Sequence, residues 1–196
     1  MDDNFASIVG AVKMGRRICD NLQKALAYIF AIHVPIAGLS LIPVFFGDMP
    51  LLLWPVHIVF LELIIDPACS IIFEAEKEED NIMTRPLKSR NEAFFPRRKI
   101  FISCMQGISI LAIVLAIYLT GLYSWQMPVG QVRALSFIAL VAGNIGVIFT
   151  NRSWSKNIFQ IFATPNPTVK WVVAFASLFL VLANVIPFLQ GLFQFE

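Results

Sequence analysis

Two acidic residues lie inside a long apolar stretch, where a charge is costly. Glu62 and Asp66 occur in Phe60-Leu-Glu-Leu-Ile-Ile-Asp-Pro-Ala-Cys69, and their spacing of four would place both carboxylates on one face of a helix. Pro67 lacks an amide hydrogen, so it would leave a backbone carbonyl without its helical partner. Carboxylate and carbonyl oxygens are the ligands that hard cations prefer, which predicts a cation site. The alternative, that both acids are protonated or paired and only pack, leaves their large cost unexplained.

Three further polar residues are candidates for this region. His33 precedes Pro35, a proline that would kink or unwind a helix and expose the carbonyl of Ala31. His33 could therefore line an ion path or simply bond a neighbour. Asn144 could join two helices or offer an amide oxygen to a cation. His57 is interpreted as an interfacial or pore-facing side chain, and the metal-ligand hypothesis is kept for the other four residues.

Apolar stretches of membrane-spanning length must position these residues. Hydrophobic residues make up 58% of the 196-residue chain and charged residues only 14%. A soluble domain carries about 25% charged residues, so the composition excludes an ordinary soluble enzyme, a disordered chain and a nucleic-acid-binding module. A helix needs roughly 20 apolar residues to cross a bilayer, and the runs are continuous, which predicts an all-α, polytopic transmembrane helix bundle. The expected spans are Ala25–Phe46, Leu51–Phe73, Ile100–Tyr123, Ala134–Thr150 and Val169–Leu189.

Basic residues gather on one side of these spans. Of the fifteen Lys and Arg residues, only Arg133 falls on the opposite side. Connections rich in Lys and Arg stay in the cytoplasm, so the N-terminus is predicted to be cytoplasmic. Helical spacing of apolar residues from Phe5 to Ala27 predicts a cytoplasmic helix that continues without a break into the first span. The acidic run Glu74–Asp80 and the basic residues after it are interpreted as a solvated linker at the membrane surface.

These elements divide the chain into four parts. They are a cytoplasmic stalk helix (1–24), a helical hairpin with the ion-site residues (25–73), a cytoplasmic loop (74–99) and three further transmembrane helices (100–196). With five spans the C-terminus is expected on the outer side, and the odd number suggests that a helix is missing. On the residues alone, a stand-alone transporter or channel and a non-catalytic membrane subunit also fit.

Several motifs, in this order, resemble the membrane region of P-type cation-transporting ATPases. Asp2-Asp-Asn-Phe-Ala-Ser-Ile-Val9, with Gly15-Arg16 and Asn21-Leu-Gln-Lys24, resembles the stalk leading into that family's fifth transmembrane helix. Asp80-Asn-Ile-Met-Thr-Arg-Pro86 resembles the loop between its sixth and seventh helices, and Arg152-Ser153 fits the end of the eighth. The resemblance covers essentially the whole chain and implies helices five to nine of a calcium-pump-like protein.

The resemblance also implies roles for single residues. Asp66 matches the sixth-helix aspartate that coordinates the ion, and Glu62 stands where calcium pumps place an Asn. His33 falls near a fifth-helix Asn, and Asn144 lies close to the eighth-helix ligand region. These four residues form the expected metal site.

Two positions depart from the calcium-pump pattern. Ile36 and Ile65 stand where those pumps have a Glu and a Thr, so two oxygen ligands are lost while Glu62 adds a carboxylate. One divalent site or a proton-coupled site is therefore expected in place of two calcium ions. Calcium is the first cation expected, with manganese, sodium, potassium and the proton as alternatives.

The family's ATP chemistry lies outside this sequence, which has no Asp-Lys-Thr-Gly-Thr phosphorylation segment. The chain is expected not to hydrolyse ATP alone and to hold no cofactor, since ATP and magnesium would act in the missing domains. The expected partners are the rest of the pump (helices one to four, the tenth helix and the cytoplasmic domains) and the lipid bilayer, with no nucleic acid. The expected location is a bacterial plasma membrane.

Overall fold

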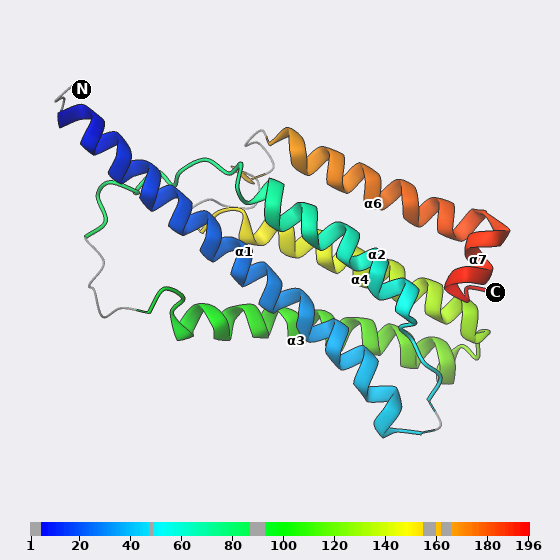
Figure 1. The fold of residues 1–196 in the computed structure, drawn as a ribbon. Coiled ribbons are helices and arrows are strands. Elements are labelled where there is room, and N and C mark those ends of the chain that lie inside the picture. The colour runs from blue at the N-terminus through cyan, green and yellow to red at the C-terminus, as the bar shows by residue number, and fades with distance from the viewer. Residues whose placement is uncertain (1–4, 48, 87–92, 155–159, 162–165) are drawn as a thin grey trace.

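Long helices build the whole fold (Figure 1). The structure is a computed structural model that describes residues 5–47, 49–86, 93–154, 160–161 and 166–196. The helices are α1 (Phe5–Phe45), α2 (Pro55–Pro67), α3 (Arg97–Leu119), α4 (Val129–Asn151), α6 (Pro167–Val185) and α7 (Pro187–Phe193). Within these ranges there is no strand, and five helices are long and apolar enough to cross a membrane. The predicted all-α transmembrane bundle is confirmed.

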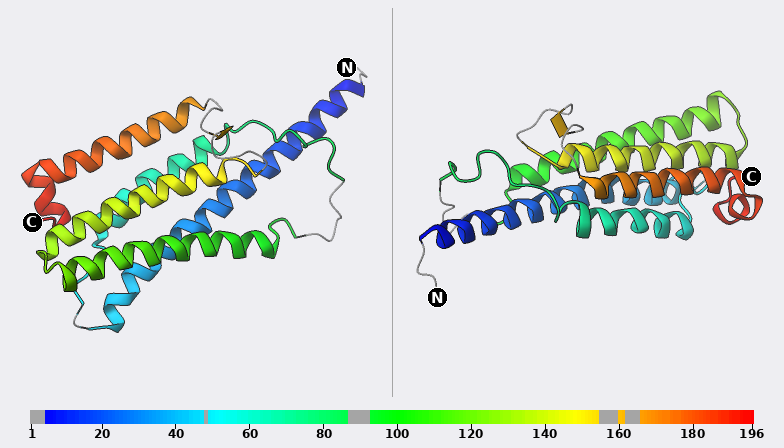
Figure 2. Two further views of the ribbon diagram at one scale, coloured as in Figure 1. Left: turned by 180° about the vertical axis from the view of Figure 1, so that it is seen from behind. Right: turned by 90° about the horizontal axis from the view of Figure 1, so that it is seen from above.

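Some residues used in the sequence predictions lie outside the described ranges. They are Asp2, Asp3 and Asn4 of the stalk motif and the basic residues Lys88, Arg90 and Lys156. The basic residues that are described lie, with the exception of Arg133, toward the end of the bundle from which α1 extends (Figure 2). This asymmetry supports the predicted orientation, and the cytoplasmic N-terminus stays a prediction.

The first helix is unbroken although two prolines, Pro35 and Pro43, lie inside it. Its start at Phe5 confirms that the helix begins well before the apolar stretch. The predicted exposure of the Ala31 carbonyl is wrong, because Ala31 is buried against α3. A Cβ atom on Gly107 of α3 would lie 2.4 Å from the Ala31 oxygen. The small residue thus lets α3 cover the carbonyl that Pro35 deprives of its helical hydrogen bond.

The second and third spans each end in a π-helical turn, which the sequence did not predict. The turn Ala68–Ile72 follows Pro67 directly, and the Phe73 amide donates to the Ala68 carbonyl at 3.1 Å. The turn Thr120–Ser124 ends the third span in the same way. A π-helical turn shifts the hydrogen-bond pairing by one residue, so the helix can continue past the position where proline has no amide hydrogen to donate. The chain therefore widens after Asp66 and does not break there.

The last predicted span is shorter than expected, because α6 ends at Val185 and Pro187 begins the short helix α7. α7 turns over the end of the bundle and brings Phe193 against the His57 ring, with 5.2 Å between ring centres. The Phe137 ring lies 4.7 Å from the same imidazole. His57 is fully buried, so the prediction of an interfacial or pore-facing histidine is wrong.

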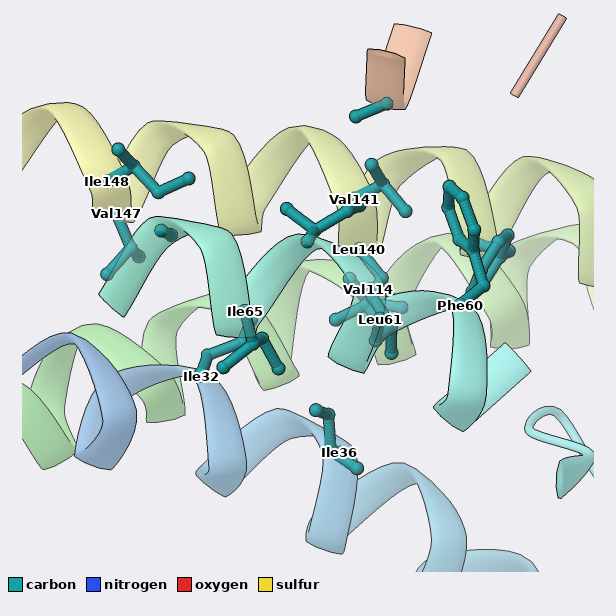
Figure 3. Packing of buried hydrophobic residues seen from close by; sticks show 14 of the residues in the cluster. Ile32, Ile36, Phe60, Leu61, Ile65, Val114, Leu140, Val141, Val147 and Ile148 are labelled. Carbon is teal, nitrogen blue, oxygen red and sulfur yellow. The ribbon is translucent and has the colours of Figure 1, made fainter. Parts of the chain in front are cut away.

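An aliphatic core fills the space between the first four described helices (Figure 3). Ile32 and Ile36 of α1, Ile65 of α2, Val114 of α3 and Leu140 of α4 all belong to one buried cluster. Figure 3 shows these side chains directed into the interior of the bundle. The part of the core that these residues form is therefore apolar.

The acidic run after α2 packs against other elements and is not the solvated linker that its composition suggested. Glu79 pairs with Lys24 of α1 at 2.6 Å, and Glu76 pairs with Arg152 at the end of α4 at 2.5 Å. All four side chains are buried. Asn166, which caps α6, also donates to Glu76 at 2.8 Å. The segment thus ties α1, α4 and α6 together through buried charges.

Side chains from one face of α1 also bind the backbone of this segment. Arg16 donates to the carbonyls of Ile82 and Arg85 at 2.7 and 2.9 Å. Further hydrogen bonds run from Arg17 and Asn21 to the Glu76 carbonyl, each at 2.9 Å. Arg85 donates to the Asp20 carboxylate, and these hydrogen bonds raise the pKa of Arg85 above its ordinary value.

Candidate cation site

Three of the four predicted site residues lie on one exposed side of α1 and α2. His33 Nε2 of α1 lies 3.9 Å from Glu62 Oε1 of α2, and the two side chains are 51% and 42% exposed. Asp66 lies one helical turn further along α2 and is also exposed. The helical spacing of Glu62 and Asp66 thus places both carboxylates on the same side, away from the aliphatic core.

The local hydrogen bonds leave these groups able to bind a cation. His33 Nδ1 lies 2.9 Å from the Ile29 carbonyl and donates to it, so the lone pair of the neutral ring is on Nε2, beside Glu62. The Asp66 carboxylate forms no hydrogen bond or ion pair with any other described side chain, and its backbone carbonyl accepts from Ser70 Oγ at 2.7 Å. Two carboxylates and one imidazole nitrogen are therefore available on this side.

Asn144 lies elsewhere, in the interior between α4 and α1. The Tyr28 hydroxyl donates to Asn144 Oδ1, and both side chains are fully buried. Of the two alternatives for Asn144, the structure shows this contact between helices, which engages the amide oxygen. Asn144 Nδ2 has no hydrogen-bond partner among the described residues. No sequence pattern indicated Tyr28 as its partner, because the contact joins residues far apart in the chain.

The acids and the histidine do not form a closed metal cage by themselves. In the described part of the chain, no three His, Cys, Asp or Glu side chains are close enough to hold one ion. Ile36 and Ile65, the positions where calcium pumps carry oxygen ligands, are both buried in the aliphatic core. Of the four predicted ligands, Glu62, Asp66 and His33 lie on the outer side of α1 and α2, so the remaining ligands of a closed site would have to come from elements that pack on that side.

A comparison with protein families shows which family this chain belongs to. The family model described as "Cation transporting ATPase, C-terminus" matches residues 50–196, about three quarters of the chain. The chain belongs to this family. Its transmembrane helices are therefore the membrane portion of a P-type cation ATPase, as the motifs predicted.

Individual relatives extend the match to the stalk. The chain is 29% identical over 197 residues to calcium-transporting ATPase 1 of Lactococcus lactis subsp. lactis (strain IL1403). The matched region covers 98% of this chain and 21% of that protein. It is 28% identical over 188 residues to calcium-transporting ATPase lmo0841 of Listeria monocytogenes serovar 1/2a, covering 94% of this chain and 20% of that protein. The chain thus spans about a fifth of the length of these bacterial relatives.

Relatives named for other cations match as well. The potassium-transporting ATPase alpha chain 1 of Xenopus laevis is 42% identical over 98 residues, which is 50% of this chain and 9% of that protein. Family membership therefore indicates cation transport, and relatives of this chain are named for more than one cation. The bacterial matches agree with the predicted bacterial membrane.

Proposed function

We propose that this chain is the cation-binding and translocating membrane portion of a P-type ATPase, and that Asp66, Glu62 and His33 form one side of its cation site. The observation that supports this most is the exposed acidic pair on α2, a helix that is otherwise largely apolar. A charged side chain facing lipid costs about 2.5–3.5 kcal/mol or more, so such groups face protein or water. This side of α1 and α2 would therefore face other helices of the pump, which would supply the remaining ligands.

Calcium is the first cation that we propose for this site. Carboxylate oxygens suit a hard cation, and the relatives that match along almost the whole chain are named for calcium. The imidazole of His33 would also suit manganese, and a monovalent ion or a proton remains an alternative outcome of the test. The isoleucines at positions 36 and 65 favour a single ion. Asn144 would contribute by holding α1 against α4 through Tyr28.

The continuity of α1 suggests how the site would be driven. α1 is one helix from Phe5 past His33, so a movement at its N-terminal part would be transmitted to the site. The cytoplasmic domains, which would bind ATP and magnesium, are the proposed source of that movement. A change in the His33–Glu62 distance would then alter cation affinity, and the carboxylates could take up protons as the cation leaves.

The proposed site predicts that Asp66→Asn weakens the cation dependence of phosphorylation in the full-length pump. Even an outer-shell partner of a metal ligand is worth about 10–100-fold in affinity, so loss of a direct ligand should raise the half-saturating cation concentration by at least about tenfold. Phosphorylation from ATP would be measured across calcium, manganese, sodium and potassium. The matched control is Glu78→Gln, which removes a carboxylate charge from the loop, outside the proposed site, where Glu78 forms an exposed ion pair with Lys13. Unchanged cation dependence in the Asp66 variant would refute the assignment.

A further inference from the structure

A cavity lined by both polar and apolar side chains lies where α3 begins and α4 ends, away from His33, Glu62 and Asp66. Its volume is about 580 Å³. Arg98 and Lys99 of α3 line it together with Asn151, the last residue of α4, and Trp154, which follows that helix. None of its described lining residues is acidic. α3 and α4 run antiparallel and side by side, so these basic and polar groups sit where both helices leave the apolar part of the bundle (Figure 2).

The cavity wall is held in place by hydrogen bonds and a cation–π contact. Lys99 Nζ donates to Gln23 Oε1 at 2.7 Å and lies 3.2 Å from the centre of the Trp154 ring. Asn151 Nδ2 donates to Gln106 Oε1 at 3.2 Å, which leaves the Gln106 amide nitrogen as a donor on the cavity wall. Two cationic side chains and an amide donor thus line one cavity, which is the chemistry that binds a phosphate oxygen.

The cavity also has an apolar side. Ile102 lines it and is exposed, and the exposed side chains of Met105 and Ile108 continue the same surface along α3 toward the middle of the span. A ligand with an anionic head and apolar tails would therefore be matched along its whole length, whereas inorganic phosphate would leave the apolar side uncovered. Trp154, which lines the cavity, agrees with a position at the membrane–water interface, where tryptophan is enriched.

We propose that the cavity between α3 and α4 binds the headgroup of an anionic phospholipid whose acyl chains lie along the exposed face of α3. The proposal depends only on the position of the chain in a membrane and not on the transported cation. Arg98 lines the cavity and Arg97 does not, so Arg98 should account for about a fivefold preference, the contribution of one basic residue at a membrane surface, and Arg97 for less.

The test is lipid retention by the intact protein. Delipidated protein would be mixed with equal amounts of phosphatidylglycerol and phosphatidylcholine, and bound lipids counted by native mass spectrometry. We expect phosphatidylglycerol to be retained in preference, and Arg98→Gln to lower that preference about fivefold. The matched control is Arg97→Gln, which removes the same charge from the neighbouring exposed residue outside the cavity lining.

Three outcomes would overturn the proposal. No preference for phosphatidylglycerol would exclude an anionic-lipid site. An equal loss in the Arg97 and Arg98 variants would mean diffuse attraction to a basic surface and no defined cavity. Displacement of the lipid by excess inorganic phosphate would mean that the cavity binds phosphate and does not recognise the acyl chains.

Discussion

Replacing Lys24 with methionine should destabilise the protein strongly, because the buried ion pair between Lys24 and Glu79 would be lost. Lys24 Nζ lies 2.6 Å from Glu79 Oε1, and the two side chains are only 1% and 5% exposed. Removing one partner of a buried ion pair costs about 3–5 kcal/mol. Glu79 would keep hydrogen bonds from Ser153 Oγ at 2.8 Å and the Trp154 amide at 3.4 Å. We therefore expect the lower end of the range, about 3 kcal/mol.

Thermal unfolding of the purified chain in detergent, followed by circular dichroism, would measure this loss. At roughly 2–4 °C per kcal/mol for a chain of this size, the midpoint should fall by about 6–12 °C. The control is Lys13→Met, because Lys13 forms an ion pair with Glu78 at the same 2.6 Å distance with side chains 45% and 38% exposed. The hydrogen bond from Lys13 lowers the pKa of Glu78, but solvent screens this pair, so the midpoint should not change.

The comparison of the two lysines tests the role of burial directly. Equal effects of Lys24→Met and Lys13→Met would refute the reasoning, since the two pairs have the same length and differ in exposure. A neutral Lys24→Met variant would refute it as well. The double variant Lys24→Met/Glu79→Leu should recover part of the loss, because both charges of the buried pair are then replaced by apolar side chains.

Two further substitutions test the packing of the helices by the same unfolding assay. Gly107→Ala should lower the unfolding midpoint, because its Cβ would lie 2.4 Å from the Ala31 carbonyl oxygen. Gly146→Ala should be tolerated, because a Cβ atom at this position would have no neighbouring atom within 4 Å. Arg133→Met should cost about 1–3 kcal/mol, because its guanidinium donates to backbone carbonyls before α2 and after α7 at 2.5–3.1 Å. Unchanged midpoints would contradict both expectations.

The helices and the exposed acidic pair were predictable from short stretches of sequence. The length of each apolar run predicted a span, and the spacing of Glu62 and Asp66 predicted their common face. The ends of the helices were harder to predict. The π-helical turn after Pro67 and the start of α7 at Pro187 depend on which carbonyl oxygens the backbone amides near each proline donate to. The effect of Pro35 was overestimated, since Gly107 on another helix covers the Ala31 carbonyl.

The acidic segment shows a signal that was present in the sequence and was interpreted differently. Lys13, Arg16, Arg17 and Lys24 follow helical spacing, so they share one face of α1 and can meet an acidic strip. Composition alone suggested a solvated linker, because acidic residues are usually exposed. In the structure the segment packs on that face, and the apolar side chains of α1 around Ile18 are exposed.

The sequence by itself determined the membrane helices, the clustering of basic residues at one end, the acidic pair and the family. All of these depend on local runs, spacing and motifs. Only the tertiary structure decided that His33 lies beside Glu62, that Asn144 pairs with Tyr28, and that Glu79 is buried on Lys24. Each of these contacts joins residues far apart in the chain, and which partner a polar side chain meets depends on how the helices pack.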